Sequence, residues 1–454
     1  MALNTSGAIS LAGSTTGQSI AIELGQSATG TIALNDTVVR DLAGIASGAI
    51  TMPGDFWGKS STIVGPLYYI GDNGYGSAGN NNTTPYTTSP VLAAGGRTDW
   101  VRVANGGIKT DGGHVLAIDD TGRLWSWGNN DYGQLGLNST VRKLSPVQIG
   151  SATNWESVST GCWTTGRAMG AAVNSSGGAW VWGDNYFQQI TNWNRSATGV
   201  RNPCSSPVQL GTGNIYQTFN TLITSVSRIM IANGKNCYVL KNNGVMYAAG
   251  QNYFGACGIN YSYNDVAYEP VQGGITDWVE ASCSSSGNSN SYFVRQASGL
   301  LYACGIGQFG ANGNNNTALT LSSPVNIGGG YKTVRGTEYG GIGIRTNGQL
   351  YAWGRNSKGM CGQNNTVAYS NPVQIGSLTT WDRFLEDATN EDAIAMFKTD
   401  GTLWALGYAR QIDQVSGGNV YYSSPVQIMS TFTSSYTISH ASSSGSQGTI
   451  FLVD

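Results

Sequence analysis

Charged side chains are scarce in this chain. Asp, Glu, Lys and Arg make up 11% of its 454 residues, whereas about 25% is usual for a globular domain. The formal net charge is −2, so the chain offers no basic field for a nucleic-acid backbone. Gly, Ser, Thr and Asn take the place of the missing charges, which predicts a surface solvated by hydroxyl and amide groups.

Residues that carry out catalysis are also few. The only histidines are His114 and His440, and no zinc-protease helix motif, nucleophile elbow or phosphate-binding loop occurs. The seven cysteines contain no CxxC pair and leave one unmatched, which argues against a disulfide framework or a zinc site. We therefore predict no enzymatic activity, no cofactor and no metal. One acidic group is expected to form a solvated loop, with Ca²⁺ binding through its carboxylates as the alternative: Glu386, Asp387, Glu391 and Asp392.

The beginning of the chain lacks the usual targeting features. Residues 1–35 have neither a basic start nor a long apolar run. This predicts neither a secretory signal nor a membrane span. We accordingly expect synthesis in a cytosol.

What the chain has in abundance is a repeat. The segment Leu124–Gly136 reads LWSWGNNDYGQLG, and related segments recur along the chain at intervals of 49 to 67 residues. A period of this size is typical of propellers and solenoids. The central glycines of the seven copies are Gly71, Gly128, Gly183, Gly250, Gly305, Gly354 and Gly407.

Each repeat contains the pattern of four short strands. An apolar strand such as 114–118 reaches a tight turn at Asp120, Thr121 and Gly122, and a second strand, 124–127, follows. The next parts are a loop with a GxxG pair, a strand start at a proline such as Pro146, and a short strand that carries an aromatic residue. Four strands make one propeller blade. The sequence therefore predicts an all-β fold, a seven-bladed β-propeller over residues 65–454.

The two ends of the repeat array complement each other. The last strand, 449–453, aligns with 114–118, and the second half of its hairpin is found at 65–71. We therefore expect the C-terminal strand to close the propeller by pairing with the first strand of the array, which leaves no open sheet edge.

These repeats resemble the regulator of chromosome condensation repeat, whose core reads LYxWGxNxxGQLG followed by PxxV and an HxLAL strand. The second copy matches it nearly throughout, and His114 occupies a position that this family fills with a structural histidine. The third and seventh copies lack the second glycine pair, over 184–190 and 408–412. Cys257 and Cys361 stand where Leu135 stands, which predicts small buried residues. The resemblance implies a scaffold and leaves its function to be argued from a site.

The first 64 residues form a separate, small β-rich segment without the repeat. The stretch 32–60 is similar to a leader of structural proteins of tailed bacteriophages, including those that infect cyanobacteria. The resemblance implies a virion assembly and anchoring segment over residues 1–64, although a decorative extension is the alternative. The residues that we assign to anchoring are Asn35, Asp36, Arg40, Leu42, Phe56, Trp57 and Lys59.

A recognition site is predicted on the longest loop. Ten of the thirteen tryptophans occupy recurring repeat positions and are expected to pack within blades. The longest loop is 184–204. In this repeat the marker glycine Gly183 and the proline Pro207 are 24 positions apart, against 18 to 20 positions in the other repeats. Long loops on a rigid scaffold often carry recognition; plain loop variation is the alternative. The residues proposed for ligand or partner contact are Tyr186, Phe187, Trp193, Asn194, Arg195 and Trp163.

The sequence thus suggests a non-enzymatic bacteriophage virion protein, part of a tail fibre or host-contacting appendage. The expected partners are other virion proteins, copies of this chain and a host surface polysaccharide, with no nucleic acid and no membrane insertion. A capsid or baseplate decoration without a receptor role is the first alternative. An exchange factor for a small GTPase, the role of the protein that names the repeat family, is a remote one.

Overall fold

The computed structural model divides the chain into two compact units, Met1–Ile63 and Val64–Asp454. It describes residues 64–453 except 85–86, 107–112, 164–166, 188–189, 191–202, 213–220, 233–234, 263–265, 272–274, 284–290, 297, 318–319, 338, 385–392, 409–420, 429–437 and 445–447. The anchoring residues predicted between Asn35 and Lys59 lie outside the described residues. The account below concerns the second unit alone.

The second unit is built from antiparallel four-stranded sheets, numbered here along the chain. Sheet 1 contains β2 (Thr87–Leu92), β1 (Leu67–Gly71), β30 (Gly448–Val453) and β29 (Ile438–Ser444). Sheet 2 contains β3 (Trp100–Gly106), β4 (His114–Asp119), β5 (Leu124–Gly128) and β6 (Lys143–Gln148). Sheet 3 contains β7 (Trp155–Trp163), β8 (Arg167–Asn174), β9 (Ala179–Gly183) and β10 (Cys204–Gln209).

The remaining sheets repeat this plan. Sheet 4 contains β13 (Val226–Ala232), β14 (Asn236–Lys241), β15 (Met246–Gly250) and β16 (Val266–Pro270). Sheet 5 contains β17 (Trp278–Cys283), β18 (Ser291–Gln296), β19 (Leu301–Ile306) and β20 (Thr320–Gly328). Sheet 6 contains β21 (Tyr331–Thr337), β22 (Gly340–Arg345), β23 (Leu350–Gly354) and β24 (Tyr369–Gln374). Sheet 7 contains β25 (Trp381–Phe384), β26 (Ala393–Lys398), β27 (Leu403–Tyr408) and β28 (Tyr421–Ile428).

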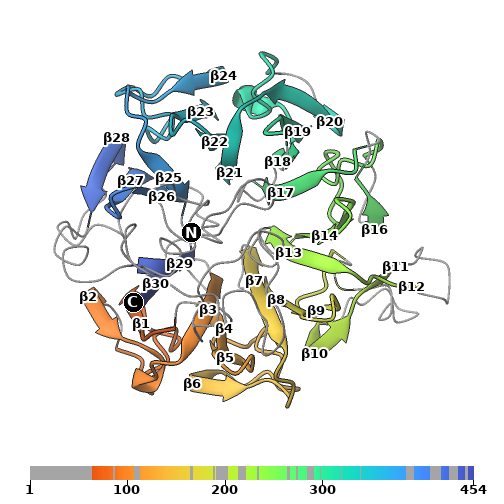
Figure 1. Cartoon of the computed structure of the whole chain (residues 1–454), viewed down its shortest axis with the longest axis vertical. Helices are drawn as coiled ribbons and strands as arrows, with labels where there is room; N and C mark the ends of the chain where they lie inside the picture. Colours follow the sequence, from red (N-terminus) through yellow and green to blue (C-terminus); the bar gives the residue numbers. More distant parts are fainter. Residues whose placement is uncertain are drawn as a thin grey trace, which may run out of the picture. The chain divides into compact units, whose positions relative to one another are not determined.

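The sheets of this unit follow one another around a propeller (Figure 1). The first strand of each sheet contacts the first strand of the next, from β29 through β3, β7, β13, β17 and β21 to β25. Sheet 1 combines both ends of the array, because β1 pairs with β30 from Leu67 opposite Leu452 to Gly71 opposite Gly448. Figure 1 shows this as blue strands beside an orange one. In the described part of the chain, no helix has the length and hydropathy needed to cross a membrane.

The hairpin turns explain why glycine recurs at fixed places. Gly122, between β4 and β5, has φ +74°, and a Cβ there would collide with the carbonyl oxygen of Thr153 in the following connection. Prolines, by contrast, are placed differently from the prediction. Pro146 lies inside β6 rather than at its start. This position is tolerated because β6 is the outermost strand of its sheet and its neighbour β5 shifts register there.

One loop type links five of the sheets to the sheet that follows. In sheet 2, the Asn130 side chain accepts the N–H of Leu135 at 3.0 Å and donates to the carbonyl oxygen of Ser139 at 2.8 Å. The loop ends at Asn138, whose φ is +53° and whose N–H donates to Ser205 of sheet 3 at 2.7 Å. Equivalent bonds join Asn81 to Leu144, Asn260 to Ser322, Asn315 to Ser370 and Asn364 to Ser423.

These bonds correct the expected count of blades. The prediction was seven blades, but in the described structure five sheets carry the repeat loop docked on the following sheet and count as blades: sheets 1, 2, 4, 5 and 6. Sheets 3 and 7 have four strands each, yet their sequences lack the second glycine pair. The all-β propeller is confirmed, whereas the count of seven blades was wrong.

A buried tryptophan reinforces the regular junctions. Trp182 of sheet 3 is fully buried and donates its indole N–H to Gln134 of sheet 2 at 2.8 Å. Trp127 and Trp353 make the same bond to Ser77 and Ala311 of the preceding loops. Cys304 takes this place in sheet 5, and its thiol lies 3.4 Å from the carbonyl oxygen of Ala256. The repeat pattern in the sequence is therefore a pattern of contacts between sheets.

Candidate functional site

The connections of the propeller emerge at two ends. In an antiparallel sheet, the loops between the first and second strands and between the third and fourth strands lie at the same end. We call this end the loop face. The loop 184–203, which joins β9 to β10, therefore begins on the loop face, as do the ends of β7 and the start of β8.

A buried carboxylate begins the long loop. Asp184 is 1% exposed, and its Oδ1 accepts a hydrogen bond from Arg167 Nη1 at 3.0 Å. Burial raises the pKa of Asp184 above its usual value, although the charge of Arg167 acts in the opposite direction. The pair fixes the first residue after β9 against the first residue of β8.

The same arginine lies among aromatic rings. Its guanidinium carbon is 4.4 Å from the ring centre of Tyr186 and 5.3 Å from that of Tyr132, which belongs to the loop of sheet 2. Tyr186 is 40% exposed. A guanidinium stacked on a ring keeps N–H groups at its edge for further hydrogen bonds. Arg167, Tyr132, Tyr186 and Asp184 thus form a polar and aromatic cluster that crosses the junction of sheets 2 and 3.

Phe187 has another role than the one predicted. It is 5% exposed and meets the ring of Tyr186 edge-on, with centres 5.0 Å apart. The ammonium of Lys235, itself 1% exposed, lies 5.5 Å from the Phe187 ring centre. Burial lowers the pKa of Lys235 to about 8. Phe187 therefore packs against the ring of Tyr186 and is too buried to contact a large ligand.

The other predicted site residues are placed less completely. Trp163 is the last residue of β7, and its backbone pairs with Arg167 on the loop face. Trp193, Asn194 and Arg195 lie outside the described residues. Sequence reasoning missed Arg167, Tyr132 and Lys235. The sequence signal that could have revealed Arg167 is the charge of Asp184 in the same repeat. Asp184 directly follows its marker glycine, where the second repeat has the neutral Asn129.

The remaining chemical candidates belong to the core. His114 is fully buried, and its Nε2 lies 3.2 Å from the carbonyl oxygen of Met169 in sheet 3. Burial lowers its pKa to about 4, so it is neutral at physiological pH and supplies a hydrogen bond between sheets. Cys257, Cys304 and Cys361 are buried as expected, and burial raises the pKa of Cys304 and Cys361 to about 12.

Metal coordination finds no support among the described residues, where no group of three or more His, Cys, Asp or Glu side chains could hold an ion. The acidic group between Glu386 and Asp392 lies outside them. Electrostatically, the loop face combines arginine and exposed aromatic rings. This combination can bind a ligand by stacking and hydrogen bonding, and the described residues of this face include no arranged nucleophile or acid–base pair.

Known proteins share both the repeat and the fold. The model of the regulator of chromosome condensation (RCC1) repeat matches residues 121–166 and 347–384. The E3 ubiquitin-protein ligase HERC2 of Homo sapiens is 28% identical over 131 residues, which are 28% of this chain and 2% of HERC2. The ultraviolet-B receptor UVR8 of Arabidopsis thaliana is 24% identical over 320 residues, 69% of this chain and 66% of UVR8.

The structural comparison extends over most of the chain. Prp20p of Saccharomyces cerevisiae, a protein described with binding to Gsp1p and histones, superposes with a TM-score of 0.65 over 87% of this chain and 92% of its own. The sequence identity is 16%, so this likeness shows the fold. Two segments of this chain are thus similar to the RCC1 repeat, and its second unit has the fold of an RCC1-like propeller.

Proposed function

We propose that this chain is a non-enzymatic bacteriophage virion protein, part of a tail fibre or host-contacting appendage, and that its loop face binds a host surface glycan or a neighbouring virion protein. The observation that supports a binding role is the cluster of Arg167 and Tyr186 beside the buried Asp184. An exposed ring held in place by a guanidinium is preorganised, so little conformational freedom is lost when a ligand packs on it.

The virion assignment rests on the leader resemblance over residues 32–60. A segment of this size is too small to bury a core of its own. We infer that it folds against a virion partner, while the propeller folds independently because its sheets make their own contacts. The protein would then be made in the host cytoplasm and be located in the virion.

Removal of the leader tests this assignment. Purified 65–454 should unfold cooperatively at a temperature close to that of the full chain. Particles that assemble in cells producing only the truncated protein should not incorporate it. Particles that contain the truncated protein at normal copy number would contradict the assembly role. Immunolabelling of intact particles then separates the two virion alternatives, because a tail fibre and a capsid or baseplate decoration are labelled at different places.

The exchange-factor alternative is supported only by fold similarity. Prp20p shares 16% of its residues with this chain, and a scaffold of this kind carries many functions. Unaltered nucleotide release from a small GTPase in the presence of the purified chain would remove this alternative.

A further inference from the structure

We propose that the loop face binds an extended acidic polysaccharide along an arc over sheets 2 to 6. This inference rests on the proposed glycan-binding function and deepens it by naming the class of glycan. The arc is defined by one exposed or half-buried side chain in each of five consecutive sheets, of which Arg355 is the half-buried one: Arg142, Tyr186, Tyr253, Phe309 and Arg355.

All five residues belong to connections at the same end. Tyr186, Tyr253 and Phe309 lie in loops between the third and fourth strands of sheets 3, 4 and 5. Arg142 directly precedes β6, and Arg355 directly follows β23, so both belong to the same type of loop. Because these connections share one end of an antiparallel sheet, the side chains line one face of the propeller.

Aromatic rings recur on this face with the same geometry. Tyr253 meets Phe254 edge-on at 5.1 Å between ring centres, as Tyr186 meets Phe187 at 5.0 Å. The outer ring of each pair stays accessible, and Tyr253 is 61% exposed. Both tyrosines follow their marker glycine by three residues. The pattern therefore presents exposed rings in neighbouring repeats, each supported by a second ring.

The third ring is held in an unusual backbone conformation. Phe309 has φ +59°, in the left-handed region that a bulky residue rarely adopts, and remains 39% exposed. It meets Tyr339 edge-on at 5.2 Å. Here Gly307 replaces the asparagine that organises the loop in sheet 2. Core packing does not explain a strained and exposed aromatic residue. We therefore assign Phe309 to ligand contact.

Arginines complete the arc at both ends. The guanidinium of Arg355 lies 5.5 Å from the ring centre of Phe309 and 5.2 Å from that of Tyr339. Arg142 is exposed and lies 5.2 Å from the ring centre of Tyr75. Stacking holds a guanidinium flat, so its edge can pair with a carboxylate through two parallel hydrogen bonds. Rings that pack against sugar C–H faces and arginines that pair with carboxylates together fit a polymer of uronic acids.

The extent of the arc favours a polymer over a small ligand. Its side chains are distributed one per sheet, so a single sugar reaches only one of them. A long chain that occupies several weak sites at once gains affinity from their linkage. Nucleic acid is the competing polyanion, and displacement of the polysaccharide by duplex DNA would favour it instead.

The test uses the purified full-length protein and affinity electrophoresis in gels that contain polygalacturonate or, in parallel, neutral dextran. Polygalacturonate should retard the protein more strongly than dextran. The Arg142→Gln and Arg355→Gln variants should each weaken the retardation roughly three- to fivefold. Arg123→Gln, an exposed arginine in the hairpin at the opposite end, should behave as the unchanged protein. Melting temperatures establish that each variant is folded.

Two further comparisons make the result decisive. A galacturonate tetramer should bind roughly tenfold or more weakly than the polymer, and duplex DNA should not displace the polymer. Equal retardation by both polysaccharides, none by either, an equal effect of Arg123→Gln, or equal affinity for the tetramer would each overturn the inference. Failure of the virion role would appear instead in particle composition, so the two failures are distinguishable.

Discussion

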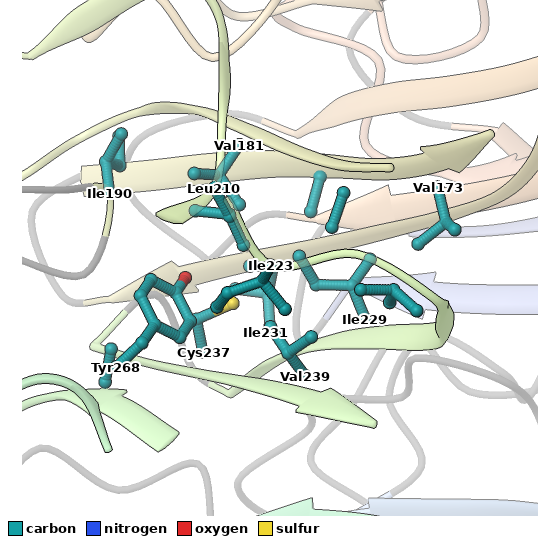
Figure 2. Close-up of a cluster of buried hydrophobic side chains, with 14 of the residues drawn as sticks. Val173, Val181, Ile190, Leu210, Ile223, Ile229, Ile231, Cys237, Val239 and Tyr268 are labelled. Atoms are coloured by element: carbon teal, nitrogen blue, oxygen red, sulfur yellow. The ribbon is translucent and has the colours of Figure 1, made fainter. Parts of the chain in front are cut away.

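Two neighbouring junctions of the propeller are held together by different means. Between sheets 2 and 3, the repeat supplies polar contacts: Trp182 to Gln134, Asn138 to Ser205 and His114 to Met169. Between sheets 3 and 4, the position of Trp182 is taken by Ala249, and the cluster in Figure 2 fills the space with aliphatic side chains from several segments.

The second junction is assembled partly from connections. Leu210 and Ile223 flank the two short strands β11 (Gly211–Thr212) and β12 (Thr221–Leu222), and Ile190 comes from the long loop. A hydrogen bond also crosses this junction, from the N–H of Ile231 to Ser159 Oγ at 3.0 Å. Apolar burial therefore replaces the docked loop. In the complete blades, by contrast, the loop is bound to the next sheet.

Loss of the buried indole should have the largest effect on the regular junction. Trp182→Ala should lower the free energy of unfolding by about 3–5 kcal/mol, because it removes a fully buried ring and leaves a cavity. Trp182→Phe keeps most of the apolar volume but loses the hydrogen bond to Gln134, and should cost less. Urea unfolding measures both. Equal losses for the two variants would show that the ring volume is unimportant.

The irregular junction should respond to apolar truncation. Leu210→Ala should lower the free energy of unfolding by about 2–5 kcal/mol, since its side chain is fully buried in the cluster of Figure 2. The milder Ile223→Val should cost about 0.5–1.5 kcal/mol. Urea midpoints with unchanged slopes are the readout. A negligible loss for Leu210→Ala would mean that this junction is not maintained by apolar burial.

Acid should weaken the regular junction through His114. Its folded pKa is lowered from 6.5 to about 4 by burial, so its contribution to stability is complete above pH 6.5. That contribution is lost as the pH falls towards 4, because the unfolded chain binds a proton that the folded chain excludes. A shift of this size corresponds to roughly 3 kcal/mol. The difference in unfolding free energy between the unchanged protein and His114→Gln, measured from pH 7 to 4, isolates this effect; a difference independent of pH would refute it.

The limits of sequence reasoning follow from this contrast. Marker glycines, buried tryptophans and His114 could be predicted because each recurs at a fixed repeat position, and recurrence in sequence reflects recurrence of contacts. The burial of Phe187 could not be predicted, because its neighbour Lys235 comes from another sheet. Likewise, Arg167 and Asp184 belong to one repeat, but the contact of Arg167 with Tyr132 of sheet 2 is not revealed by any spacing within that repeat.

Substitutions in the long loop should change stability least and recognition most. The double variant is Tyr186→Ala, Trp193→Ala. Among the contacts of the described residues, it removes those of Tyr186 with Arg167 and Phe187. An exposed contact of this kind contributes about 0.5–1 kcal/mol. The unfolding free energy should therefore stay within about 1 kcal/mol of the unchanged protein. Leu378→Ala, at an exposed apolar residue of the opposite end, serves as the matched control.

Adsorption of particles to host cells, measured beside the unfolding free energy of the same variants, tests the central claim that the irregular loop region carries recognition. The double variant should weaken host contact by about 1–3 kcal/mol, seen as slower adsorption, because aromatic contacts dominate such interfaces. Particles with Leu378→Ala should adsorb normally. Normal adsorption by particles that carry the folded double variant would contradict the claim and favour a decoration role.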